Sequence, residues 1–145
     1  MSRPRFHLAF PVSDLGEARS FFGGLLGCDE GRSAPRWVDF DFFGHQLVAH
    51  LVNAKDHPAA TNNVVDGHAV PASHFGVILD WQVFEGFALK LKQSKVDFVI
   101  DPYLRFKGQR GEQDTLFIRD PSNNYLEFKA FRNIDMLFDK DIDNA

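Results

Sequence analysis

The fold is decided in residues 5–27, which read RFHLAFPVSDLGEARSFFGGLLG. Residues 5–12 favour a short strand that ends near Pro11. Asp14 with Glu17 three positions later is a capping-box pattern, which marks the start of a helix. Apolar residues then recur at helical spacing as far as Gly27, a typical helix stop: Leu15, Ala18, Phe21, Phe22, Leu25 and Leu26. The stretch therefore predicts a strand followed by a helix over 14–26.

The rest of the first half continues with strands. Residues 37–43 alternate between apolar and polar, Gly44 and His45 favour a turn, and residues 46–52 are rich in β-formers. A short extra strand is expected near 28–33. The first half is therefore read as a β-α-β-β unit with room for one more strand.

The second half repeats this order, with a helix over about 82–94 that Asp80 caps, and strands at 73–79, 96–100, 114–119 and 125–131. Residues 120–124, Asp-Pro-Ser-Asn-Asn, are a strong turn signal. Residues 101–113 are polar and contain glycine, and they are expected to form a loop.

These patterns predict an α+β fold made of two tandem β-α-β-β-β modules in a single domain, 1–145. The expected parts are a first module (5–53), a connecting segment (54–72) that is either a linker or a pocket lid, a second module (73–132) and a C-terminal tail (133–145), frayed and acidic from 139. Neither module can bury both faces of its sheet alone. We therefore expect the modules to pair into one curved mixed sheet around a cavity, with the helices outside.

Composition narrows the function classes. The 145 residues carry 16 Phe, a single cysteine (Cys28) and a net charge of −4. The net negative charge argues against nucleic-acid binding, which needs a basic surface. A lone cysteine is typical of a protein in a reducing compartment. No signal peptide and no apolar run long enough to span a membrane is evident, so we expect a cytoplasmic protein.

Strand alternation sorts the polar residues onto one face. The expected helix-covered faces carry Phe6, Leu8, Phe75, Val77, Leu126 and Phe128. The opposite faces carry His7, His50, His74 and Glu127, at positions that correspond in the two halves. Imidazoles and a carboxylate that converge inside a sheet suit a divalent transition metal. The alternative is that each histidine is an ordinary half-buried strand residue.

Two stretches resemble the vicinal oxygen chelate superfamily, which contains glyoxalase, bleomycin-resistance and extradiol dioxygenase proteins. One is Phe6-His-Leu-Ala9 followed by Val12 to Gly27, and the other is Phe117 to Phe128. The resemblance covers about residues 5–132. Residues 42–51 and 127–132 most resemble proteins described as predicted extradiol-type dioxygenases.

The resemblance implies a metal bound by His7, His74 and Glu127. The metal expected is Fe(II), with Zn, Ni or Mn as alternatives. It also implies a small-molecule substrate with adjacent oxygens, and we expect a homodimer with no nucleic-acid or membrane partner. His50 falls where glyoxalase I enzymes place a fourth ligand, usually Glu, so it is expected to act as a ligand or as an acid–base group.

Three functions fit these residues: an extradiol-type dioxygenase, a glyoxalase I-like lyase or epimerase, and a metal-free ligand-binding protein.

The expected pocket wall consists of aromatic residues suited to a planar substrate: Phe40, Phe42, Tyr103, Tyr125 and Phe131. Tyr103, Arg105, Lys107 and Arg110 form a basic segment that could close over an anionic or phenolic substrate, or be an ordinary solvated loop. His57 and His68 are read as acid–base candidates or surface residues, and His45 and Cys28 as structural.

Overall fold

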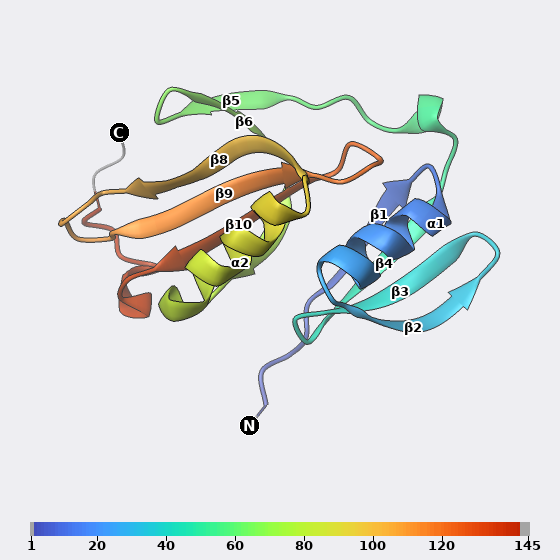
Figure 1. Ribbon diagram of the computed structural model, residues 1–145, viewed down its shortest axis with the longest axis horizontal. Coiled ribbons are helices and arrows are strands. Elements are labelled where there is room, and N and C mark those ends of the chain that lie inside the picture. The colour runs from blue at the N-terminus through green and yellow to red at the C-terminus, as the bar shows by residue number, and fades with distance from the viewer. Residues whose placement is uncertain (1, 143–145) are drawn as a thin grey trace. The chain divides into compact units, whose positions relative to one another are not determined.

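The computed structural model describes residues 2–142, which divide into two compact units. The first unit contains the chain up to residue 59 together with residues 120–124, and the second contains residues 60–119 and the chain from 125 onward. Figure 1 shows the elements of each unit. No helix within residues 2–142 is long and apolar enough to cross a membrane.

The first unit holds a four-stranded sheet in the order β1-β4-β3-β2. Its strands are β1 (His7–Val12), β2 (Asp29–Ala34), β3 (Trp37–Phe42) and β4 (His45–Leu51). β1 pairs parallel with β4, and the other pairs are antiparallel. The predicted β-α-β-β order and the extra strand are confirmed, although His45 lies in β4 and the turn before it is formed by Phe43 and Gly44.

The helix of this unit begins as predicted. The Asp14 carboxylate accepts a hydrogen bond from the backbone N–H of Glu17 at 2.8 Å. α1 (Leu15–Ala18) then continues as a π-helix (Arg19–Leu25), and Gly27 follows with a φ of 73°. The π geometry was not predicted. Its wider turn places the successive rings of Phe21 and Phe22 in the core together.

Aromatic packing under the helix fixes the faces of this sheet. The Phe22 ring lies 5.1 Å from that of Phe10 and 5.5 Å from that of Phe40. Phe10 and Val12 are therefore on the helix side of β1, as the alternation predicted. The prediction for Phe6 is wrong, because it is 60% exposed and lies just before β1 begins, where its N–H donates to Nδ1 of His45. Leu8 is half-buried.

The second unit repeats the arrangement, with the sheet order β7-β10-β9-β8 and α2 (Trp81–Gln93) packed on it (Figure 1). The strands are β7 (Phe75–Ile78), β8 (Asp97–Arg105), β9 (Gln113–Arg119) and β10 (Tyr125–Phe131). β7 pairs parallel with β10. Leu126 and Phe128 are fully buried, and the Phe128 ring lies 4.7 Å from that of Phe87 on α2. Phe75 and Val77, on the edge strand, are half-buried.

The loop predicted over 101–113 is wrong in its first half. β8 runs on to Arg105, so Tyr103 and Arg105 belong to a strand, and the loop spans only 106–112. The alternation of β8 is hidden by Pro102 and by two irregularities in its pairing with β9, between Phe98 and Tyr103.

The connecting segment contains a hairpin that was predicted only as a linker or lid. A short 3₁₀ helix (Ala54–Asp56) precedes β5 (Asn62–Val65) and β6 (His68–Pro71), which form a two-stranded sheet of their own. Its turn is Asp66-Gly67, with φ of 50° and 77°. An Asp-Gly pair between β-forming residues is a hairpin signal that the sequence carried.

The turn at 120–124 is confirmed and belongs to the first unit. The buried Asp120 carboxylate accepts hydrogen bonds from the backbone N–H groups of Ser122 and Asn124, and from the Asn124 side chain. Asn124 Nδ2 also donates to the Pro11 carbonyl at 2.8 Å. The turn therefore completes the polar contacts of β1.

The C-terminal segment has structure before the part that was predicted to be frayed, which begins at residue 139. A 3₁₀ helix (Ile134–Met136) follows β10, and Asp139 forms an ion pair with Arg110 in the β8–β9 loop. Residues 143–145 of the predicted tail lie outside the described part of the chain. Two similar modules and the α+β class are confirmed, and the pairing of the modules into one curved sheet stays a prediction.

Candidate functional site

The sheet face opposite α2 carries a histidine–glutamate pair. His74 lies immediately before β7, and Glu127 lies in the middle of β10. Nε2 of His74 is 3.2 Å from Oε1 of Glu127. Both side chains are largely shielded from solvent, with 25% and 15% of their surfaces exposed. The alternation prediction for these two residues placed them correctly on this face.

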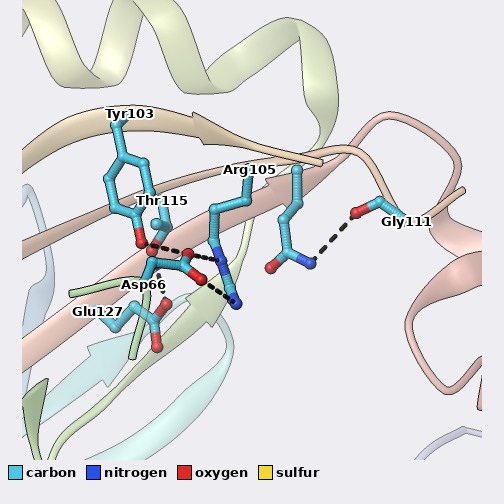
Figure 2. A network of polar contacts seen from close by, with 7 residues as sticks. Asp66, Tyr103, Arg105, Gly111, Thr115 and Glu127 are labelled. Atoms are coloured by element: carbon cyan, nitrogen blue, oxygen red, sulfur yellow. Dashed lines mark hydrogen bonds and ion pairs between the residues drawn. The ribbon is translucent and has the colours of Figure 1, made fainter. Parts of the chain in front are cut away.

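Neighbouring groups restrict what can lie between these two atoms. Nδ1 of His74 lies 2.6 Å from the carbonyl oxygen of Pro71, which can only accept, so Nδ1 carries a proton. Thr115 Oγ1 donates to the other carboxylate oxygen, Oε2, at 2.6 Å (Figure 2). A neutral His74 would then turn its Nε2 lone pair toward a carboxylate oxygen. The pair therefore needs a shared cation, either a proton on Nε2 or a metal ion.

The pKa values of the pair follow from this geometry. The hydrogen bond to Glu127 raises the pKa of His74 above its ordinary value of 6.5, and the Pro71 carbonyl adds to the effect against the influence of burial. Burial raises the pKa of Glu127, but the hydrogen bond from His74, the charge of Lys129 and the hydrogen bond from Thr115 together bring it below its usual range.

We expect His74 in metal-free protein to titrate above 6.5, the ordinary histidine value, and to do so because of Glu127. A pKa raised by folding means that the protonated form stabilises the fold. This contribution is complete below the unfolded pKa and is lost as the pH rises through the raised folded value. NMR titration of the His74 imidazole measures the pKa, and Glu127→Gln should lower it. An unchanged pKa in that variant would show that the pair does not interact.

A second polar cluster lies on the same sheet and joins it to the hairpin (Figure 2). The Asp66 carboxylate accepts a hydrogen bond from the Tyr103 hydroxyl at 2.9 Å and from Arg105 Nε at 2.5 Å. The His68 ring lies 4.9 Å from the Tyr103 ring. Burial and the hydrogen bond to Asp66 raise the pKa of Tyr103 to about 12. Tyr103 is therefore a neutral hydrogen-bond donor in this structure.

His7, the predicted ligand of the first module, lies at the start of β1 and is exposed. Its Nδ1 donates to Oε1 of Gln46 at 2.8 Å, and Gln46 Nε2 donates in turn to Asp39. The contact leaves Nε2 of His7 with a lone pair, as a metal ligand requires. His7 is placed on the face opposite Phe10, as predicted.

The predicted correspondence between His50 and Glu127 is wrong by two residues. Glu127 pairs with Gly76, two positions after His74. In the first unit, the residue two positions after His7 is Ala9, and its partner is Val48. His50 instead pairs with Pro11 and is exposed. The residue beside His7 in the parallel pair is Gln46, which was not among the predicted site residues.

The predicted pocket residues separate into two groups. Phe40 and Phe42 are 1% and 2% exposed and lie on the helix-covered face of β3, so they belong to the core and not to a pocket on the open face. Tyr125 and Phe131 share the open face of β10 with Glu127. Lys107 and Arg110 are exposed in the loop after β8.

Three further residues have structural contacts. His57 Nε2 lies 3.2 Å from the Asn124 side chain, and His45 accepts from the N–H of Phe6. Cys28 is buried, which raises its pKa to about 11, so it is not a thiolate nucleophile at neutral pH.

The donor set supports a metal site only in part. His74 and Glu127 are brought together. Nδ1 of His74 and Oε2 of Glu127, the atoms turned away from the pair, are already hydrogen-bonded, as is usual for metal ligands. His7 belongs to the other unit, and residues 2–142 contain no group of three His, Cys, Asp or Glu side chains placed to hold a metal. Thr115 was not predicted as part of the site: it follows the polar Gln113 and Asp114 and directly precedes the apolar residues of β9, so nothing in its local sequence marks it.

Comparisons with known proteins agree with this architecture. A crystal structure of a glyoxalase/bleomycin resistance protein/dioxygenase from Alicyclobacillus acidocaldarius is 36% identical, with a TM-score of 0.76 over 94% of this chain and 97% of that one. The fosfomycin resistance protein FosX from Listeria monocytogenes is 15% identical, with a TM-score of 0.68 over 94% and 98%, and so shares the fold. No curated protein matches the chain.

The sequence model of one family matches residues 6–128, which include the first module, most of the second and the His74–Glu127 pair. The chain belongs to the Glyoxalase/Bleomycin resistance protein/Dioxygenase superfamily.

Proposed function

We propose that this protein is a metal-dependent enzyme acting on a small molecule with adjacent oxygens, of the extradiol dioxygenase type. The observation that carries the proposal is the 3.2 Å approach of His74 Nε2 to Glu127 Oε1, with Nδ1 committed to the Pro71 carbonyl. We assign His74, Glu127 and His7 as the ligands. Two histidines and one carboxylate are the ligand set of non-haem Fe(II) oxygenases.

The chain's own residues hold these ligands in place. Thr115 fixes the Glu127 carboxylate through Oε2 and leaves Oε1 facing His74. The Phe117 ring meets the His74 ring nearly edge-on, with centroids 5.0 Å apart, and limits its rotation. Bound Fe(II) would supply a centre that chelates two adjacent substrate oxygens and lowers their pKa.

Proton transfer is assigned to His50. It is exposed on the face of β4 opposite Leu47 and Ala49, the face that also carries Gln46 beside His7. In β4 the position that corresponds to Glu127 is Val48, two residues before His50. This offset favours an acid–base role for His50 over a ligand role.

The Alicyclobacillus protein, 36% identical over 94% of this chain, is compatible with this class, because its description names dioxygenases. The same description names glyoxalases, so a lyase activity is the second outcome to test.

The test is metal analysis of anaerobically purified protein, followed by oxygen uptake with catechol. We expect bound iron and catechol-dependent oxygen consumption, both lost in His74→Gln. The matched control is His45→Gln, which removes a histidine whose ring accepts from the Phe6 backbone and should keep both. Zinc or nickel with isomerisation of the methylglyoxal–glutathione adduct would replace the dioxygenase by a lyase. Failure to bind any metal would leave a ligand-binding protein.

A further inference from the structure

Arg105 and Tyr103 together form a receptor for a carboxylate. Arg105 Nε and Nη2 approach the two carboxylate oxygens of Asp66 at 2.5 and 3.4 Å, and the Tyr103 hydroxyl donates to Oδ2 at 2.9 Å. The guanidinium also lies over the Phe106 ring, 4.8 Å from its centroid, which restricts its plane. A forked donor with an added hydroxyl is suited to any carboxylate, whether it comes from the chain or from a ligand.

Asp66, whose carboxylate fills this receptor, lies on a hairpin that is not part of the four-stranded sheet. Asp66 forms the tip of the β5–β6 hairpin, whose two four-residue strands pair with each other and not with the four-stranded sheet. Val64 of the hairpin is 81% exposed. A two-stranded hairpin is only marginally stable by itself, so contacts at its tip contribute much of what holds it on the sheet. These contacts are the hydrogen bonds of the Asp66 carboxylate and the tilted packing of the His68 ring against the Tyr103 ring.

The Asp66 side chain is not required by the turn. A φ of 50° at the first turn position is met equally well by asparagine. What aspartate adds is a negative charge opposite Arg105. Two hydrogen bonds and this ion pair keep the pKa of Asp66 below its usual range although burial raises it, so the carboxylate is ionised.

The receptor adjoins the proposed ligands. Tyr103 pairs with Thr115 across β8 and β9, and Thr115 donates to Glu127 at 2.6 Å. Figure 2 shows the Asp66 carboxylate between Arg105 and Tyr103, and the hydrogen bond from Thr115 to Glu127 in the same view. A molecule whose oxygens reached Glu127 and His74 could therefore place a second polar group at Arg105.

We propose that Tyr103 and Arg105 bind a carboxylate of the substrate, and that Asp66 is a tethered carboxylate which the substrate displaces. Displacement releases the tip of the hairpin, so binding and hairpin opening are coupled. The substrate class is then a carboxylic acid that also carries adjacent oxygens. Calling this ligand the substrate rests on the proposed function, but the carboxylate site does not.

The test uses full-length protein treated with EDTA, so that it is independent of any metal. The probes are benzoate and its neutral counterpart benzamide, with binding followed by NMR shifts of the backbone amides. Asp66→Asn keeps the turn and removes the competing carboxylate. This variant should bind benzoate about tenfold more tightly than the wild-type protein, because the charge-assisted site is then free. The affinity for benzamide should not change. Asp66→Asn with Arg105→Gln should cancel the gain.

The matched control is Asp97→Asn, which removes the carboxylate that pairs with Arg119 elsewhere on β8 and β9. It should leave benzoate affinity unchanged. Equal benzoate affinity in Asp66→Asn and the unchanged protein would overturn the proposal and reduce Asp66 to a structural contact. So would a gain shared by Asp97→Asn or by benzamide. A protein that fails to bind metal but passes this test would overturn the proposed function and leave the carboxylate site standing.

Discussion

Glu127→Gln should lower the affinity for a divalent metal at least about 100-fold, since loss of even an outer partner of a ligand costs about 10–100-fold. The amide has no negative charge to offset that of the cation. It still offers an oxygen to the Thr115 hydroxyl, which lies 2.6 Å from the carboxylate in this structure. We therefore expect the variant to remain folded, with a change in unfolding free energy of about 1 kcal/mol. Metal titration monitored by calorimetry, alongside circular dichroism, measures both effects.

The control for this variant is Glu112→Gln. Glu112 is also buried, but it accepts from Gly108 and pairs with Arg132 near the β8–β9 loop. It should leave metal affinity unchanged. If Glu127→Gln binds metal as tightly as the unchanged protein, Glu127 is not a ligand and the assignment of the site fails.

Gly76→Ala should destabilise the protein by about 3 kcal/mol or more, at the upper end of what overpacking costs. Gly76 pairs with Glu127 between β7 and β10. A Cβ at this position would overlap the carbonyl oxygen of Glu127 and lie 2.6 Å from its carbonyl carbon. Backbone cannot yield as a flexible side chain can, so β7 must move away from β10. Because the displaced backbone is that of Glu127, metal affinity should fall as well.

The same substitution at Gly86 is the matched control for this effect. Gly86 lies inside α2, and a Cβ there would meet no atom within 4 Å. Gly86→Ala should therefore stabilise the protein by about 0.5–1 kcal/mol through helix propensity. Urea unfolding of both variants gives the comparison. Equal stability of Gly76→Ala and the unchanged protein would mean that β7 and β10 do not pair as described.

The parts of the site that alternation alone determines were predictable. Leu126 and Phe128 are buried on the helix side of β10, so Glu127 had to face the other way. His7 follows from Phe10 by the same rule. The helix starting at Asp14 was predictable because its capping residues are local in sequence.

Register between distant strands was not predictable, because a period of two residues does not say which residue lies opposite which. The placement of His50 failed for this reason, since β1 and β4 align Pro11 with His50 and Ala9 with Val48. β8 was missed in part because Pro102 and its irregular pairing break the alternation that marks a strand. The role of Asp66 depends on a contact 39 residues away, with Arg105.

The turn at 120–124 has a consequence for synthesis of the chain. The first unit is built from residues up to 59 and from this turn, so translation delivers its last piece only after most of the second unit has been made. Until Asn124 leaves the ribosome, the Pro11 carbonyl lacks its donor and the Ser13 N–H lacks the Ser122 oxygen. The first unit therefore cannot finish folding before residues 120–124 have been synthesised. A chain truncated after residue 59 would contain an incomplete first unit.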